Sequence, residues 1–226
     1  MSRIALAFVL ALASASAGAT VTRAVPFDEK VNRADAIILG ECVETRSEWD
    51  PSKRFILTRS VFRVAESLKG AAAAELTIVT PGGSVEGIHQ DSIGIPAFRE
   101  GDERVLFVRS TRAGQTLLYF DQGTYDVTTD ERGEKIVHPV ASEAVLVDTQ
   151  RGMAVRPEGA MSLREFRQSV RDSVRRAHVQ KMRVLEEERR RAEESSLRSI
   201  LARNKALVAL ALIGIALATW QLLKRS

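Results

Sequence analysis

The chain has 226 residues, of which 33 are Lys or Arg and 29 are Asp or Glu, and it contains one cysteine and 5% aromatic residues. The charges are unevenly distributed: residues 18–159 hold 17 basic and 22 acidic side chains, whereas residues 160–205 hold 13 basic and 7 acidic ones. The acidic first part and the scarcity of aromatic residues argue against nucleic-acid binding, and one cysteine excludes an internal disulfide.

The N-terminus has the composition of a secretory signal peptide. Arg3 precedes the apolar run IALAFVLAL, which is followed by the small residues ASASAGA. A positive start, a short apolar core and a small-x-small motif are the parts of such a signal, with cleavage after Ala17 or Ala19. A retained anchor helix is the alternative, but this apolar run is too short to span a bilayer. We therefore predict a signal peptide over residues 1–19.

Residues 20–160 are predicted to form one β-rich domain, because short apolar runs alternate with turn residues. The glycine in the middle of the first run, Gly40, indicates a β-bulge, and Gly114, Gly133 and Gly152 mark hairpin turns. Cys42 lies in the same first run and is expected at a buried strand position; an intermolecular disulfide or a reactive thiol is the alternative. The predicted strands lie in the runs DAIILGECVETR, FILTRSVFRVAESLKG, AELTIVT, ERVLFVRS and TLLYFDQG.

Residues 161–204 change to a helical pattern. Ser162 and Glu165 form a capping box, and Met161 and Phe166 are spaced as a hydrophobic staple. The apolar stripe that follows predicts packing on the β domain, with a membrane-surface helix as the alternative. Past Lys181 charged residues replace the stripe, which predicts a solvated helical stalk. The stripe consists of Leu163, Phe166, Val170, Val174 and Ala177.

Residues 205–223 are predicted to form a single transmembrane anchor, followed by a short cytoplasmic tail at 224–226. The run ALVALALIGIALATWQLL carries no charge, and as a helix it would be about 27 Å long, close to the thickness of the hydrocarbon core. The signal peptide places the preceding domain outside the cytoplasm, periplasmic or extracellular. The basic residues before the run favour the opposite orientation, a tail-anchored protein with a cytoplasmic head. A tail removed by processing is a further alternative.

The segment Thr80–Val108 contains five glycines and two prolines between two apolar runs. It lacks the glycine spacing of a phosphate-binding loop, and Ser84 lacks the second glycine of a nucleophile elbow because Glu86 stands there. His89 and Asp91 could share a metal or a proton, but no third ligand is apparent. We expect no catalytic, metal or cofactor site here.

The polar tip of this segment is the candidate contact surface for a partner. We expect four apolar side chains, Ile88, Ile93, Ile95 and Phe98, to pack the segment down on the domain. The candidate partner-binding residues are Ser84, Glu86, His89, Gln90 and Asp91.

Four motifs, RADAIILGECVE, FRVAESLKG, ELTIVTPGGSV and GDERVLFV, resemble the netrin-like domain family, which includes the tissue inhibitors of metalloproteinases. Uncharacterised bacterial secreted proteins with a PGG…G…P pattern are expected to be nearer relatives. The resemblance implies an OB-like five-stranded Greek-key barrel followed by a packed helix. Inhibition in that family needs an N-terminal cysteine that chelates the protease zinc. This chain has no cysteine near Gly18 or Thr20, so that activity does not carry over.

The sequence thus predicts a mainly β protein, a membrane-anchored extracytoplasmic binding or assembly module that presents an OB-like barrel on a helical stalk. A structural subunit or spacer of a membrane complex is the alternative, and a protease inhibitor or an enzyme is a third class. The expected partners are an unidentified protein and, through the C-terminal helix, membrane lipid, with no nucleic acid.

Overall fold

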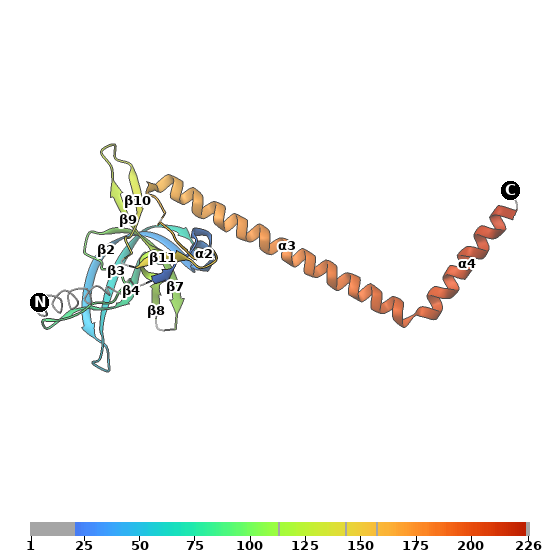
Figure 1. The fold of residues 1–226 in the computed structure, drawn as a ribbon, viewed down its shortest axis with the longest axis horizontal. Helices are drawn as coiled ribbons and strands as arrows, with labels where there is room; N and C mark the ends of the chain where they lie inside the picture. The colour runs from blue at the N-terminus through green and yellow to red at the C-terminus, as the bar shows by residue number, and fades with distance from the viewer. Residues whose placement is uncertain (1–20, 113, 143, 157, 225–226) are drawn as a thin grey trace, which may run out of the picture. The chain divides into compact units, whose positions relative to one another are not determined.

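The computed structural model describes residues 21–112, 114–142, 144–156 and 158–224, and within α3 and α4 the side chains of 197–198, 200–202, 205–208 and 222 fall outside that description. The chain divides between Val174 and Arg175 into two compact units, each described by itself below. The predicted signal peptide and the last two residues lie outside the described residues. As predicted, the chain is mainly β, with one large sheet and a helical C-terminal part (Figure 1).

The first unit contains the strands and the short helical segments. Its strands are β1 (Val21–Arg23), β2 (Ala36–Trp49), β3 (Ile56–Lys69), β4 (Glu75–Pro81), β5 (Gly83–Val85), β6 (Ile88–Gln90), β7 (Glu103–Thr111), β8 (Gly114–Leu117), β9 (Thr124–Thr129), β10 (Lys135–Pro139), β11 (Val145–Asp148), β12 (Met153–Ala154) and β13 (Met161–Ser162). Among the described residues, the helical segments are α2 (Phe27–Arg33), the 3-10 turn η1 (Phe120–Gly123), α3 (Leu163–Arg203) and α4 (Lys205–Lys224). The helix α3 begins in the first unit, and α4 belongs to the second.

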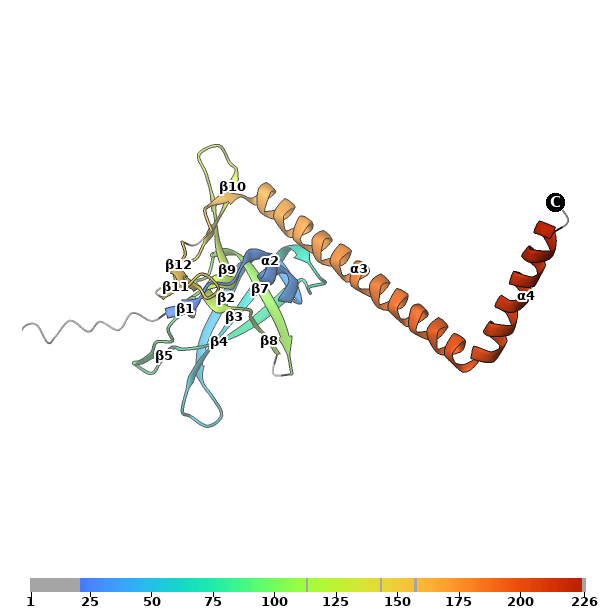
Figure 2. The ribbon, with the colours of Figure 1, turned by 45° about the vertical axis from the view of Figure 1, so that its right-hand side comes forward.

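The large sheet has eight strands in the order β13-β10-β9-β7-β2-β3-β4-β8, and β8 pairs additionally with β7. The pairings β7–β2–β3–β4–β8–β7 therefore return to the strand from which they start. All of them are antiparallel except the contact of β4 with β8, which is parallel at Ile78 and Gln115. Figure 2 shows these strands curving around one another. Two smaller sheets, β1-β11-β12 and β5-β6, complete the unit.

The long strands β2 and β3 are bent by shifts in their register. One shift falls between Leu39 and Gly40, as the glycine predicted. A Cβ at Gly40 would lie 2.9 Å from the carbonyl oxygen of Arg63, so the backbones of the two strands approach too closely there for a side chain. The predicted hairpin turns are also present. Gly133 and Gly152 have positive φ between paired strands, and Gly114, also with positive φ, is the first residue of β8 and pairs with Thr111 of β7.

Both faces of β2 and β7 are buried, in two separate clusters. Alternate side chains of a strand point to opposite faces, so Ile37 and Leu39 join one cluster while Ile38 joins the other. Cys42 belongs to the second cluster and is fully buried, as expected, and burial raises the pKa of its thiol. The first cluster is Val31, Ala34, Ile37, Leu39, Val105, Phe107, Leu118, Tyr125, Val127, Val137, Leu163, Phe166 and Val170. The second is Ile38, Cys42, Phe62, Leu76, Ile78, Phe98, Leu106, Val108 and Leu117.

The start of α3 covers the first cluster together with α2. The predicted capping box is present: Glu165 N–H donates to Ser162 Oγ (3.2 Å) and Ser162 N–H donates to Glu165 Oε2 (3.0 Å). Phe166 is fully buried and makes edge-on contacts with Phe27 and Tyr125 at 5.4 and 5.0 Å between ring centroids. The predicted stripe therefore packs on the β domain, but it ends earlier than expected, since Val174 is 38% exposed.

One predicted strand is shorter than expected. The run TLLYFDQG continues β8 as far as Leu117 and then turns into η1. Tyr119 and Phe120 have φ of 61° and 48°, which turns the chain, and Gly123 lies directly against the carbonyl oxygen of Leu118. Because the chain turns at η1, β8 and β9 can both pair with the same strand, β7.

The second unit consists of the rest of α3 and of α4. Arg189 and Glu193 form an i,i+4 ion pair at 3.0 Å. Apart from the half-buried Ala177, the side chains described in this unit are exposed. Among the described residues, no helix has the length and apolar character needed to cross a membrane. The predicted anchor at 205–223 includes five residues, 205–208 and 222, whose side chains lie outside that description.

Candidate functional site

The predicted partner-binding loop forms the hairpin β5–β6. Ser84 pairs with His89 and Val85 with Ile88, so the turn consists of Glu86 and Gly87. Both turn residues have positive φ, 52° and 80°. Two-residue turns of this kind match the twist of the strands that they join. The glycine-rich segment therefore builds a small, regular hairpin.

Two glycines and one glutamine attach this hairpin to β3. Gly82 N–H donates to the carbonyl of Ile56 (2.8 Å), and Thr58 Oγ1 donates to the carbonyl of Gly82 (2.7 Å). A Cβ at Gly83 would overlap the hydroxyl groups of Ser47 and Thr58. Gln90 accepts a hydrogen bond from Ile56 N–H (2.7 Å). Of the five predicted contact residues, Gln90 thus holds the hairpin in place with the side-chain oxygen.

Three of the predicted residues form a line of hydrogen-bonded side chains. Ser84 Oγ lies 2.7 Å from His89 Nδ1, and His89 Nε2 lies 2.7 Å from Asp91 Oδ1. His89 is 62% exposed and Asp91 86%. The structure thus brings together residues that the sequence placed in one loop, and it presents them to solvent. Glu86 lies at the turn of the hairpin and is not part of this line.

The apolar residues of this segment behave differently from the prediction. Phe98 is buried as expected, but Ile88 and Ile93 are 53% and 65% exposed. Among the described residues, the hairpin strands pair with each other and not with the large sheet, which leaves Ile88 on a two-stranded ribbon. Within the described residues, no three His, Cys, Asp or Glu side chains converge as metal ligands would.

A second candidate site surrounds Lys30, which the sequence analysis did not single out. Its side chain is 5% exposed, and Nζ donates to Tyr125 Oη (2.5 Å) and to Glu158 Oε2 (3.0 Å). Tyr125 donates its hydroxyl proton to the same Glu158 oxygen (2.5 Å). Burial lowers the pKa of Lys30 and raises that of Tyr125. Glu158 favours the protonated form of both groups, because its charge and its hydrogen bond act on each.

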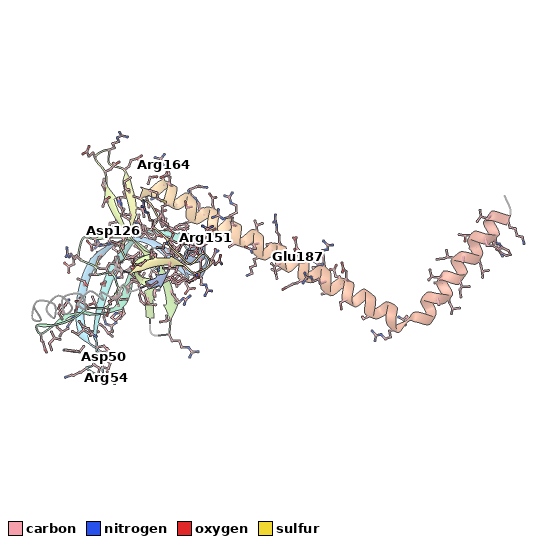
Figure 3. The ribbon with its side chains drawn as sticks, viewed as in Figure 1. Asp50, Arg54, Asp126, Arg151, Arg164 and Glu187 are labelled. Carbon is pink, nitrogen blue, oxygen red and sulfur yellow. The ribbon has the colours of Figure 1, made fainter. Side chains whose placement is uncertain are left out.

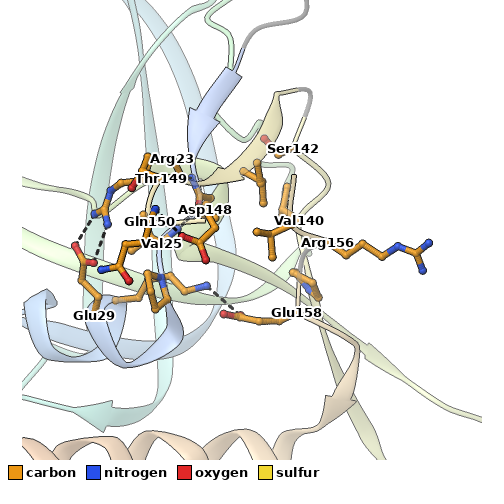
Figure 4. Close-up of a pocket in the computed structure, with 17 residues that line it drawn as sticks. Arg23, Val25, Glu29, Val140, Ser142, Asp148, Thr149, Gln150, Arg156 and Glu158 are labelled. Atoms are coloured by element: carbon orange, nitrogen blue, oxygen red, sulfur yellow. Dashed lines mark hydrogen bonds and ion pairs between the residues drawn. The ribbon is translucent and has the colours of Figure 1, made fainter. Parts of the chain in front are cut away.

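A pocket of about 390 Å³ opens beside these groups (Figure 4). It lies between α2, the sheet β1-β11-β12 and the chain that follows β12. Lys30 and Glu158 are both among its lining residues, and the dashed line that ends at Glu158 in Figure 4 marks their ion pair. Ligand pockets combine apolar surface with polar groups, and this one contains both, because seven of its 17 lining residues are apolar and ten are polar or charged. Its apolar lining is Ala24, Val25, Pro26, Pro139, Val140, Leu146 and Val155.

Part of this site could have been found in the sequence. Phe27, Lys30, Val31 and Ala34 follow the i, i+3, i+4, i+7 spacing of one helical face, which places the lysine among apolar neighbours. Its partners Tyr125 and Glu158 are 95 and 128 residues away, and no local pattern connects them.

No protein-family model, no curated protein and no solved structure matches this chain.

Proposed function

We propose that this protein is a membrane-anchored, extracytoplasmic binding or assembly module whose β5–β6 hairpin contacts a partner protein. The observation that carries the proposal is the hairpin itself. It is fixed to β3 through Gly82 and Gln90, while Ile88 and the Ser84–His89–Asp91 line are exposed. An apolar side chain among pre-ordered polar groups on a rigid support is suited to protein recognition.

The scaffold of this module is inferred to be an OB-like barrel. The strands of the closed ring are, in chain order, β2, β3, β4, β7 and β8. Around the ring they follow one another as β2-β3-β4-β8-β7, so the fifth strand lies between the third and the fourth. This Greek-key order, closed by a parallel contact, is the one expected of an OB-type barrel. The resemblance of its motifs to netrin-like domains points in the same direction. The start of α3 packs against the first cluster, and a packed helix after the barrel is what that resemblance implies.

Membrane attachment is inferred from the sequence of the C-terminal segment. Its uncharged run, from Ala206 to Leu223, has the length of a single span. Trp220 and Lys224 stand near its end, as interfacial residues do, and the Lys224 ammonium lies 4.6 Å from the centre of the Trp220 ring. The signal-like N-terminus supports an orientation with the β domain outside the cytoplasm.

The competing functions are less well supported. A structural spacer would account for the charged part of α3 but not for the exposed groups of the hairpin. A hydrolase would need a Ser–His pair in a site that excludes water and offers an oxyanion hole, and Ser84, His89 and Asp91 are all exposed. An inhibitor of the metalloproteinase type would need the N-terminal cysteine that this chain lacks.

Site-specific photo-crosslinking in native membranes tests this proposal. A photoreactive residue at Ile88 is compared with one at Arg132, which is equally exposed in the β9–β10 turn. We expect a discrete crosslinked product from position 88 that disappears when Ser84 and Asp91 are both replaced by alanine. No product at position 88, or the same product at both positions, would contradict the proposal.

A further inference from the structure

The carboxylate of Glu158 is held by the protein as a bound carboxylate ligand would be. One oxygen, Oε2, accepts a hydrogen bond from the Lys30 ammonium and another from the Tyr125 hydroxyl. Both donors come from regular elements, α2 and β9, and are almost completely buried. Glu158 comes from the irregular stretch between β12 and β13 and is 29% exposed. The donors therefore belong to a helix and a strand, while the acceptor belongs to a stretch whose described residues lie in neither.

Apolar side chains form part of the space beside this carboxylate. Ala24, Val25, Val140, Leu146 and Val155 line it together with two prolines. Burial of the methylene groups of a short alkyl chain against these side chains favours binding. A molecule that combines a carboxylate with an apolar body would thus have hydrogen-bond donors for the carboxylate and apolar side chains for the body.

The other charged groups that line the pocket have partners elsewhere or point away from it. Arg23 forms an ion pair with Glu29 at 2.7 Å. Asp148 accepts hydrogen bonds from the backbone of the turn that follows it, at Gln150 N–H (2.9 Å). The Arg156 side chain extends away from the pocket in Figure 4. Among the described lining residues, Lys30 is consequently the cation that is buried and paired with a partly exposed carboxylate.

We propose that this pocket binds a small carboxylic acid with an apolar body, whose carboxylate replaces that of Glu158 on Lys30 and Tyr125. The exchange keeps the number of charges and hydrogen bonds at the buried ammonium constant, so the ammonium is never left unpaired. Glu158 moves into water, which solvates its charge. The pocket is separate from the β5–β6 hairpin, so the inference does not depend on the proposed function.

Hexanoate and its uncharged isostere hexanamide are suitable probes. Isothermal titration calorimetry with the full chain in lipid nanodiscs, against empty nanodiscs, measures binding of both compounds. We expect saturable binding of hexanoate at least tenfold tighter than that of hexanamide. Glu158→Gln removes the competing charge and should tighten hexanoate binding by about tenfold, whereas the exposed control Glu131→Gln should not change it.

Two further variants address the donors. Tyr125→Phe should weaken hexanoate binding several-fold, and Lys30→Met should abolish the preference for hexanoate over hexanamide. Near-ultraviolet circular dichroism checks that each variant is folded, and the wild-type comparison of the two probes decides the matter even where a variant does not fold. Equal binding of hexanoate and hexanamide, or no saturable hexanoate binding to wild type or to folded Glu158→Gln, would overturn the proposal.

Discussion

Asp50 lies in the loop between β2 and β3, where Figure 3 labels it beside Arg54. Its carboxylate accepts four hydrogen bonds within this loop. Oδ1 accepts from the N–H groups of Arg54 and Phe55, both at 2.7 Å. Oδ2 accepts from the Ser52 hydroxyl at 2.5 Å and from its N–H at 3.0 Å. These donors, the hydroxyl first, lower the pKa of Asp50 to about 2. Aspartate is frequent in turns because its carboxylate accepts hydrogen bonds from the backbone N–H groups that follow it.

The stability of the protein is therefore expected to depend on Asp50 in acid. The folded pKa lies below the unfolded value of about 3.9, so the carboxylate stabilises the fold above pH 4, and this contribution is lost as the pH falls to 2. NMR titration of the Asp50 carboxyl should give a midpoint near pH 2, and Ser52→Ala should move it upward. A midpoint near 4 in the wild type would contradict the hydrogen-bonding scheme.

At the scale of elements, the packing of α3 on the first cluster depends on Phe166. Phe166→Asp is expected to destabilise the β domain by about 3–5 kcal/mol, because it removes a buried ring and buries an unpaired charge. Val174→Asp, one turn beyond the buried stripe, should cost less than about 1 kcal/mol. Urea unfolding followed by Trp49 fluorescence in a Trp220→Phe background measures both. Equal midpoints would mean that α3 does not contribute to the core.

The attachment of the β5–β6 hairpin gives a second prediction at this scale. Gly83 and Gly87 both have positive φ, but a Cβ at Gly83 would meet two hydroxyl groups, whereas one at Gly87 would meet nothing within 4 Å. Gly83→Ala should therefore cost more stability than Gly87→Ala, whose penalty is backbone strain of about 1 kcal/mol. Hydrogen exchange of the Ile56 amide, which bonds Gln90, should accelerate in Gly83→Ala alone. Unchanged exchange would show that the hairpin tolerates the added methyl group.

The elements that the sequence predicted correctly are those with a local signal. The apolar runs of β2, β3, β4 and β7, the turn glycines and the capping box of α3 all depend on neighbouring residues. The 3-10 turn η1 was missed because its cause, the contact of Gly123 with Leu118, arises only after β8 and β9 pair with β7. The exposure of Ile93 was missed because an apolar residue in a loop does not indicate whether another element covers it. The Lys30 site was missed because its partners are distant in sequence.

At the scale of the whole molecule, the chain separates its tasks between segments of different composition. The acidic residues 18–159 supply the ring of paired strands, the hairpin and the pocket, and the basic residues 160–205 supply most of α3. The uncharged run at 206–223 is the proposed anchor. In the proposed anchored arrangement, ligand and partner would be bound on the same side of the membrane, because the pocket and the hairpin both belong to the first unit.

Topology is the most direct test of the central proposal, an anchored module with an extracytoplasmic β domain. One epitope tag is inserted in the β9–β10 turn beside Gly133, and a second follows Ser226. Protease is then added to intact spheroplasts. We predict that the first tag is digested while the second is protected and stays with the membrane fraction. Protection of the first tag with digestion of the second, or protection of both, would contradict the proposal.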